Sequence, residues 1–583
     1  MNLLLIKQVG STFNVTSDKV NIEVVTFDNE KYKGNLDAFV SDLSSFKFDG
    51  IIVQDSLDES LNYLGLELCV RIRLSQERLS DRIYSTFFIF SSKDSQEIFK
   101  SQVLHKANTT ASIFYTRGVF LFDDIDFVKI LIENSSSYNL LNANNFHDQF
   151  LDVIQIKKNP LLGNHSIANL WGVIRLAEVT GNKNLLDKYF ESNPKIKDNQ
   201  SDLYFKYLIS QSSFNGIINS SKKTISATGK NILLIDDEES KGWAVILKEL
   251  LQGSNFESVL NNDNFKSTVT AKISEKINGI SKWDLILLDL RLYENEDKGD
   301  ESLKSASQFS GGKLLTEIKN DNKGVQVIMF TASNKAWNMR ELQELGADGF
   351  YIKESPEYSK DHNFSIGNYK NFEKQISHCF SRNLLKNIYF TSQKIKDKFN
   401  KNPLVKYFPS GLSQLRGIQY QNLLLNELDT IYEIVSSSND NRFNHSLLMQ
   451  FKILECLAEI FVIEKDGSDW KFWDGSIMKF YYSDNMSLLN RTDAVPVYKH
   501  ETGKKVNERI PKYWYESTGN KIHTLMSQKL GLPLNSPVHK EIDNLIGYRN
   551  KFIHPRDRMS LSSLRIEDIN VWMNSILYIV ESL

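Results

Sequence analysis

The chain has 583 residues, and its 70 Lys and Arg against 72 Asp and Glu give a formal net charge of −2 at pH 7. This length predicts several domains, each able to bury its own core, and the balanced charge excludes a global basic field for nucleic-acid binding. Three scattered cysteines exclude a disulfide frame or zinc site, and the lack of a membrane-spanning or signal-peptide run predicts a cytoplasmic protein without a membrane partner.

Residues 1–124 contain four short apolar runs that predict the strands of an α/β domain. They are LLLI at 3–6, DGIIV at 49–53, FFIF at 87–90 and GVFLF at 118–122, separated by stretches long enough for helices. No pair of acidic residues follows the first run, LLLI, and no lysine follows the last run, GVFLF. We therefore expect this domain to carry out no chemistry of its own.

Residues 125–229 carry apolar residues at helical spacing, as in IANLWGVIRLAEV. They predict a helical connector. The Ser- and Gly-containing stretch from 211 to 230 predicts a linker to the next domain.

The segment 230–383 places a reactive side chain after each of four apolar runs. The runs are NILLI, DLILL, VQVIMF and GFYI, and the residues that follow them are Asp236 with Asp237, Asp289, Thr331 and Lys353. Parallel strands of an open α/β sheet collect ligands at their carboxyl ends, so we expect these five side chains to share one edge.

These residue types match the needs of phosphorylation on a carboxylate. A carboxylate attacks a phosphoryl group only when charge on both partners is neutralised, and Mg²⁺ held by Asp236, Asp237 and Asp289 would do this. Lys353 would then pair with the phosphoryl oxygens, and Thr331 would hydrogen-bond one of them.

The pattern LLIDDEE, LILLDLRL, IMFTAS and FYIKES resembles the receiver domain of bacterial response regulators. The resemblance implies a doubly wound α/β fold, with Asp289 as phosphoacceptor, Asp236 and Asp237 as further magnesium ligands, and Thr331 and Lys353 as phosphate sensors. It also implies a histidine kinase or phosphotransfer protein as partner. The alternatives are that these are solvated carboxylates at strand ends, or that the domain responds to another ligand.

Two features depart from the receiver pattern. Glu354 follows Lys353 where receivers usually carry proline, and the stretch between Asp289 and Gly311 is long and acidic. The runs of residues 1–124 recur in the receiver's order, which predicts a degenerate receiver-like domain with Gln54 in place of Asp289 and Phe122 in place of Lys353. The alternative is an unrelated α/β domain.

Residues 384–583 predict an all-α domain with one reactive pair. In HKEIDNLIGYRNKFIHPRDR, four residues separate Arg549 from His554, and Pro555 disfavours helical geometry at His554, which lets it turn towards the arginine. A histidine moves a proton as a ribose 2′-hydroxyl attacks, and a guanidinium stabilises the charged phosphate. This pair has the groups needed for metal-independent RNA cleavage.

The stretch RNKFIH resembles the R-x4-6-H motif of the HEPN family. The resemblance implies an antiparallel helical bundle, catalytic Arg549 and His554 with Asn550 in support, no cofactor for this site, and a homodimer in which two motifs face each other. Four basic residues around the pair form a patch suited to phosphate contact: Lys540, Lys551, Arg556 and Arg558. The alternative is a bundle that binds a partner without cleaving, in which the pair caps a helix.

Together, the domains 1–124, 125–229, 230–383 and 384–583 predict a signalling protein. In this interpretation Asp289 phosphorylation controls a HEPN ribonuclease that acts on RNA, in a toxin-like or phage-defence setting. The alternative is a non-enzymatic response-regulator adaptor whose C-terminal domain binds a protein or nucleic-acid partner.

Overall fold

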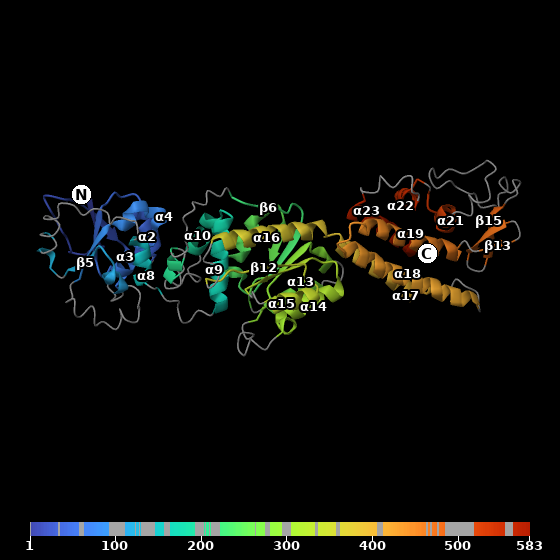
Figure 1. Cartoon of the computed structure of the whole chain (residues 1–583), viewed down its shortest axis with the longest axis horizontal. Coiled ribbons are helices and arrows are strands. Elements are labelled where there is room, and N and C mark those ends of the chain that lie inside the picture. Colours follow the sequence, from blue (N-terminus) through green and yellow to red (C-terminus); the bar gives the residue numbers. More distant parts are fainter. Residues whose placement is uncertain are drawn as a thin grey trace. The chain divides into compact units, whose positions relative to one another are not determined.

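The structure is a computed structural model that divides into two compact units, each described by itself (Figure 1). The first unit comprises Met1–Lys223, Lys241–Ile246 and Lys353–Tyr369, and the second comprises Thr224–Ser240, Leu247–Ile352 and Lys370–Leu583. The description omits isolated positions and the stretches 58–62, 92–110, 130–145, 157–163, 193–202, 211–221, 275–279, 294–304, 333–335, 357–361, 405–411, 484–517 and 554–563, and it gives no side chains for 461–517.

The first unit contains a five-stranded parallel sheet in the order β2-β1-β3-β4-β5. Its strands are β1 (Asn2–Gln8), β2 (Asn21–Phe27), β3 (Gly50–Gln54), β4 (Thr86–Phe90) and β5 (Val119–Phe122). Helices in this part include α1 (Asn29–Tyr32), α2 (Leu36–Leu43), α3 (Leu64–Arg73) and α4 (Gln76–Leu79). The four runs predicted as strands form β1, β3, β4 and β5. The edge strand β2 was missed because most of its residues are exposed, so polar residues interrupt its sequence and no continuous apolar run marks it.

The apolar runs explain why the inner strands are buried on both faces. Leu4 and Ile6 pack with the helices in one cluster, whereas Leu3 and Leu5 belong to a second cluster, as the alternation of side chains along a strand requires.

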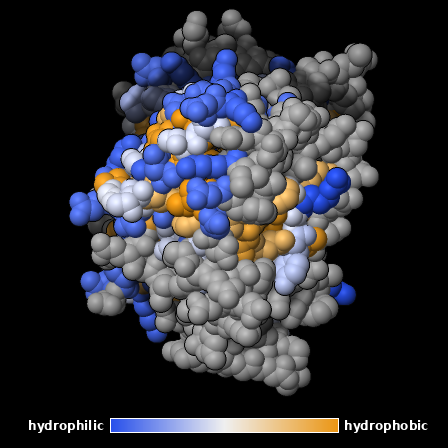
Figure 2. Space-filling view, turned by 90° about the vertical axis from the view of Figure 1, so that its left-hand side faces the viewer, coloured by the Kyte–Doolittle hydropathy of each residue, from blue (hydrophilic) through white to orange (hydrophobic). Residues whose placement is uncertain are grey.

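Figure 2 shows one face of the molecule, where hydrophobic side chains are visible between hydrophilic ones. Among the described residues of this sheet, Phe120 is 43% exposed.

The strand register corrects one of the two predicted equivalences between the sheets. In the first sheet, Gln54 of β3 and Phe122 of β5 both pair with Phe90 of β4. If Gln54 stands at the level of Asp289, then Phe90 stands at the level of Phe330, which pairs with Tyr351 of β12. Phe122 therefore lies at the level of Tyr351. The predicted equivalence of Phe122 with Lys353 is therefore wrong by two residues. It matched Gly118 with Gly349, but Gly118 precedes β5 whereas Gly349 is the first residue of β12.

The connector of the first unit is helical, as predicted. Its helices include α8 (Phe146–Ile154), α9 (Asn164–Val179) and α10 (Lys183–Ser192). The turn between α9 and α10 uses Gly181 at φ +70°, a left-handed conformation that favours glycine at the end of a helix.

The second unit contains another five-stranded parallel sheet, in the order β12-β11-β10-β7-β9. Its strands are β7 (Asn231–Ile235), β9 (Asn255–Ser258), β10 (Leu285–Leu288), β11 (Val327–Thr331) and β12 (Gly349–Ile352). The helices of this unit include α13 (Phe265–Ser274), α14 (Ser310–Asp321) and α15 (Ala336–Glu344), together with the C-terminal parts of α12 (Trp243–Leu250) and α16 (His362–Ser381), whose first residues belong to the first unit. The parallel α/β part of the predicted fold class is therefore confirmed, and its strands end at one edge.

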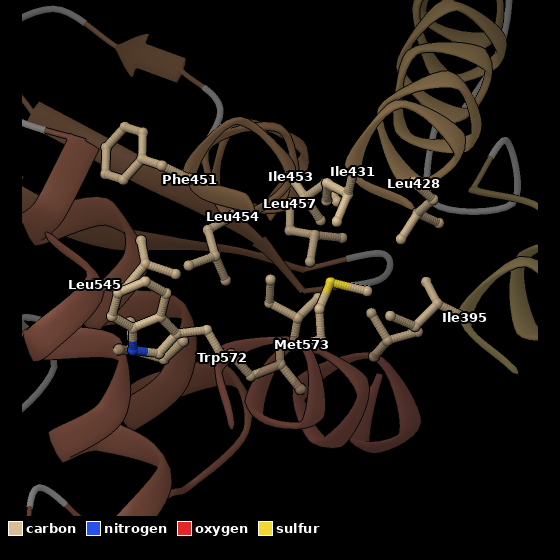
Figure 3. Close-up of a cluster of buried hydrophobic side chains, with 14 of the residues drawn as sticks. Ile395, Leu428, Ile431, Phe451, Ile453, Leu454, Leu457, Leu545, Trp572 and Met573 are labelled. Carbon is tan, nitrogen blue, oxygen red and sulfur yellow. The ribbon is translucent and has the colours of Figure 1, made fainter. Parts of the chain in front are cut away.

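The C-terminal part of the second unit is a helical bundle with its own apolar core (Figure 3). Its helices include α17 (Leu385–Lys401), α18 (Leu412–Ser436), α19 (Arg442–Phe461), α21 (Thr518–Thr524), α22 (Pro537–Ile553) and α23 (Ile566–Ser582). Trp572 and Met573 of α23 lie among side chains from α18, α19 and α22, including Ile431, Leu454 and Leu545. The predicted helical fold is confirmed here.

The expectation of an all-α domain is wrong at one place. Three antiparallel strands, β13 (Glu464–Asp466), β14 (Asp469–Asp474) and β15 (Ile477–Ser483), form a small sheet after α19. The aromatic-rich runs WKFW and KFYY favour strands because such side chains pack well on a pleated surface.

Helix α17 belongs to the bundle and also contacts the α/β sheet of the second unit. Lys386 Nζ lies 2.8 Å from Oδ1 of Asp284, next to the start of β10, and the Lys386 carbonyl accepts a hydrogen bond from Asn322. Burial raises the pKa of Asp284, but hydrogen bonds from Lys386 and the Asn231 backbone outweigh it and hold the pKa below its ordinary value. A Cβ atom at Gly324 would lie 2.3 Å from the backbone of Leu385, so only glycine fits there.

Among the described residues, no helix is long and apolar enough to cross a membrane.

Candidate functional site

Three carboxylates meet at the carboxyl edge of the sheet in the second unit. Asp236 and Asp237 follow β7 directly, and Asp289 follows the neighbouring strand β10. One oxygen from each carboxylate lies within 4.8 Å of one from each of the others. Asp236 and Asp289 are buried, and Asp237 is half-buried. The parallel pairing of Ile235 with Leu288 accounts for this meeting, because it sets the residues that follow the two strands side by side.

The donor set fits a small divalent cation. Carboxylate oxygens are the ligands that Mg²⁺ prefers, and like charges in one buried place require a neutralising partner. Asp236, Asp237 and Asp289 would be its protein ligands. The prediction that these three residues come together is therefore supported by geometry.

Backbone hydrogen bonds orient two of the carboxylates. The N–H of Leu290 donates to Oδ1 of Asp289 at 2.6 Å, and the N–H of Glu238 donates to Oδ1 of Asp236 at 2.9 Å. The Asp289 N–H itself donates to the Ile235 carbonyl at 2.9 Å. The loop after each strand thus fixes its carboxylate before any ligand arrives, which lowers the cost of ordering the site.

Glu239 is a further buried carboxylate that sequence reasoning did not single out. It is 5% exposed, and burial raises its pKa, with a smaller contribution from the charge of Asp236. The backbone N–H of Asn261 donates to it at 3.3 Å. Its position in the run DDEE was the available signal.

Thr331 and Lys353 end the next two strands. Thr331 is the last residue of β11, is 4% exposed and pairs with Ile352 of β12. Lys353 follows β12 directly and is fully buried, with its Nζ 5.8 Å from the ring centre of Trp243. All five predicted residues therefore follow or end parallel strands of one sheet.

Gly311 is a glycine that the site requires. A Cβ atom there would lie 2.0 Å from the carbonyl oxygen of Asp289 and 2.8 Å from the backbone of Leu290. Its N–H donates to the Leu290 carbonyl at 3.0 Å, which holds the start of α14 against the strand end.

Gly311→Ala is therefore expected to displace the backbone that carries Asp289. We expect at least about a tenfold loss in affinity for Mg²⁺, because a ligand carboxylate leaves its position. Titration of the full chain with Mg²⁺, followed by Trp fluorescence or calorimetry, checks this. Gly367→Ala is the control, since a Cβ atom at Gly367 would meet nothing within 4 Å. Equal affinity in both variants would contradict the role of Gly311.

The predicted C-terminal site is described only in part. Arg549 is on α22, with its guanidinium carbon 4.5 Å from the ring centre of Phe451, and its Nη1 donates to Oδ1 of Asn550 at 3.1 Å. Burial lowers the pKa of Arg549, and the charge of Glu455 partly offsets this. His554 lies outside the described residues.

The predicted basic patch is also described in part. Lys540 and Lys551 are exposed on α22, and Arg556 and Arg558 lie outside the described residues.

A buried histidine pair beside this region was not predicted. His523 Nε2 lies 2.8 Å from Oδ1 of Asp543, and the rings of His523 and His539 stack with centroids 5.7 Å apart. Burial, followed by the charge of the neighbouring His523, lowers the pKa of His539 to about 4, whereas the charge of Asp543 acts in the opposite direction. The Ser536 Oγ lies 3.3 Å from Nδ1 of His539. The two histidines are on different helices, so no local pattern in the sequence predicts that they pair.

The neutral His539 is expected to make the bundle sensitive to acid. The unfolded chain binds a proton near the ordinary value of 6.5 but the folded chain does so only at about 4, so this stability is present above pH 6.5 and is lost as the pH falls to 4. The loss at low pH is about 3 kcal/mol. Thermal unfolding of the full chain from about pH 7.5 to 4.5 checks this against His539→Gln, which cannot charge. An equal acid loss in both proteins would contradict it.

Compared with known proteins, the chain matches no family model, and no curated protein sequence matches it.

Proposed function

We propose that the chain is a two-component-type signalling protein in which Asp289 accepts a phosphoryl group and thereby controls the C-terminal helical domain. The meeting of Asp236, Asp237 and Asp289 at one sheet edge carries this proposal. Thr331 and Lys353 support it, because they supply a hydroxyl and an amine after the neighbouring strands.

The reaction is a transfer of one phosphoryl group. A carboxylate oxygen of Asp289 attacks the phosphorus, a new O–P bond forms, and the bond between phosphorus and the donor breaks. The donor is a phosphohistidine of a histidine kinase or phosphotransfer protein, and its imidazole leaves with a proton from solvent. Bound Mg²⁺ supplies neutralising charge for both partners. Lys353 pairs with the transferred oxygens, and Thr331 donates a hydrogen bond to one of them.

Helix α17 offers a physical route from this sheet to the bundle. It contributes Ile388 and Ile395 to the bundle core, and Lys386 binds Asp284 beside the same strand that carries Asp289. Close-packed elements respond to a shift by moving between discrete arrangements, so a change at β10 biases the position of α17.

The output that we propose is a HEPN-type ribonuclease that cleaves RNA without metal as a homodimer. Arg549 would stabilise charge on the phosphate, with Asn550 in support, and His554 would transfer a proton. A non-enzymatic adaptor is the second candidate. The packing of Arg549 over Phe451 favours it, because such a contact gives the arginine a structural use.

The test is cleavage of labelled single-stranded RNA by the full chain, with and without Mg²⁺ and a small phosphodonor such as acetyl phosphate. The proposal predicts products with cyclic phosphate ends and a cleavage rate that changes when phosphodonor and Mg²⁺ are both present. Phosphoryl uptake without any cleavage would favour the adaptor instead.

A further inference from the structure

A buried ionic network in the first unit ties α9 to the residues that follow Lys353. The Nη1 atom of Arg175 lies 3.2 Å from Oε2 of Glu178 on the same helix. Its Nε donates to Ser365 Oγ at 3.0 Å and lies 3.8 Å from Oε2 of Glu354. Ser365 donates to that same Glu354 oxygen at 2.6 Å. We call these four residues the α9 network.

The burial of the α9 network makes its geometry demanding. Arg175 is fully buried, and Glu354 and Ser365 are each 1% exposed. Charged groups are tolerated in such surroundings only while their partners stay in place. The segment that begins at Lys353 is therefore fixed by α9 through a contact that resists small displacements.

Close packing adds to this constraint. A Cβ atom at Gly172 would lie 3.0 Å from the backbone nitrogen of Glu354 and 3.1 Å from the ring of Trp243, so a side chain there would press on both segments. The Nε1 of Trp243 also donates to Oδ1 of Asn169 at 2.9 Å, and both residues are fully buried. Helix α9 thus contacts Trp243, in the segment that follows Asp236 and Asp237, and Glu354, in the segment that follows Lys353.

We propose that Arg175 and Glu354 are positioning residues for Lys353, and that this pair makes α9 respond to phosphorylation of Asp289. This rests on the proposed function. Lys353 and Glu354 are joined by one peptide bond, so a movement of the lysine towards a phosphoryl group displaces a carboxylate that is locked to Arg175. Coupling of this kind is reciprocal, so the state of α9 also sets how readily Asp289 is phosphorylated.

The departure from the receiver pattern at position 354 has a physical explanation in this proposal. A proline there has no carboxylate, so it offers Arg175 no ionic partner. Glutamate supplies both an ionic partner and an acceptor for Ser365 and Asn368, with the Asn368 amide 3.3 Å from Oε1.

The test compares Glu354→Gln with Glu178→Gln in the full chain. Both substitutions remove one carboxylate from Arg175, but only Glu354 is joined to Lys353. Hydrogen exchange of peptides covering 164–179 is measured with Mg²⁺, before and after addition of acetyl phosphate, beside the rate of phosphoryl uptake by intact mass. Arg175→Lys is a further variant, which keeps the charge and loses the planar geometry. Thermal melting confirms that each variant is folded.

In the natural chain and in Glu178→Gln, phosphorylation is expected to change exchange in 164–179 by about fivefold or more. In Glu354→Gln this response is lost, and phosphoryl uptake slows by about fivefold. Arg175→Lys is expected to lose the same response. If Glu354→Gln and Glu178→Gln show the same exchange response and the same rate of uptake, this inference is overturned but the proposed function is not. The same holds if the natural chain takes up a phosphoryl group without any change in exchange. No phosphoryl uptake by the natural chain overturns the proposed function, and the inference with it.

Discussion

Replacing Asp289 with Asn is expected to reduce phosphoryl incorporation from a small phosphodonor to background. An amide oxygen is a poor nucleophile, and the substitution also removes one of the three carboxylates that meet at the sheet edge. The measurement is intact-mass spectrometry of the full chain after incubation with acetyl phosphate and Mg²⁺. The folded structure should persist, because Asn has nearly the same shape as Asp.

Two matched variants separate the roles of the carboxylates. Asp237→Asn keeps the proposed nucleophile and should raise the Mg²⁺ concentration needed for incorporation by about tenfold or more, because one anionic ligand is lost. Asp321→Asn removes an exposed charge at the end of α14 and should have no effect. Normal incorporation by Asp289→Asn would show that another residue accepts the phosphoryl group.

Replacing Arg549 with Ala is expected to lower RNA cleavage by about 10²- to 10³-fold, the usual cost of removing one donor that stabilises charge in a transition state. Alanine is the residue that most favours a helix interior, so α22 should remain helical. The measurement is the single-turnover rate on labelled single-stranded RNA. His554→Ala should lose about 10²- to 10⁴-fold because proton transfer is removed.

Lys540→Ala is the control for Arg549, because it removes an exposed cation from the same helix. It should weaken RNA binding by no more than about threefold, as expected for one phosphate contact. Comparable losses in Lys540→Ala and Arg549→Ala would mean that Arg549 contributes general charge only. Unchanged cleavage in Arg549→Ala would leave it as a packing residue over Phe451.

The sequence was informative where one local pattern determines both the strand and the reactive residue. NILLI, DLILL, VQVIMF and GFYI end at Asp236, Asp289, Thr331 and Lys353, and the parallel registers then bring the strand ends to one edge. Edge strands were harder to predict. In β9, the residues Asn255–Ser258 are exposed or half-buried, so no continuous apolar run marks the strand.

Contacts between residues distant in the chain were beyond sequence reasoning. Arg175 and Ser365 are 190 positions apart, and Arg175 occupies a helix whose pattern predicts only amphipathic packing. The unusual Glu354 was visible as a departure, but its partner was not. His523 and His539 present the same difficulty, because a buried pair from two helices has no local signature.

Two glycines are required by packing that the sequence does not reveal. Gly311 and Gly324 occur in the sequence without any sign of why glycine is needed. In the structure, each stands where a Cβ atom would overlap the backbone of another element, beside Asp289 and Leu385 respectively. Such positions connect the site and α17 to the sheet, and they become visible only once the elements are packed.

Phosphorylation of Asp289 can be measured on the intact protein. The full chain is incubated with Mg²⁺ and acetyl phosphate, its intact mass is recorded, and the modified residue is located by reduction of the acyl phosphate followed by peptide mapping. We expect one added phosphoryl group, dependent on Mg²⁺ and located on Asp289. A chain that binds Mg²⁺ but gains no phosphoryl group, or gains it on another residue, would show that Asp289 is not a phosphoacceptor.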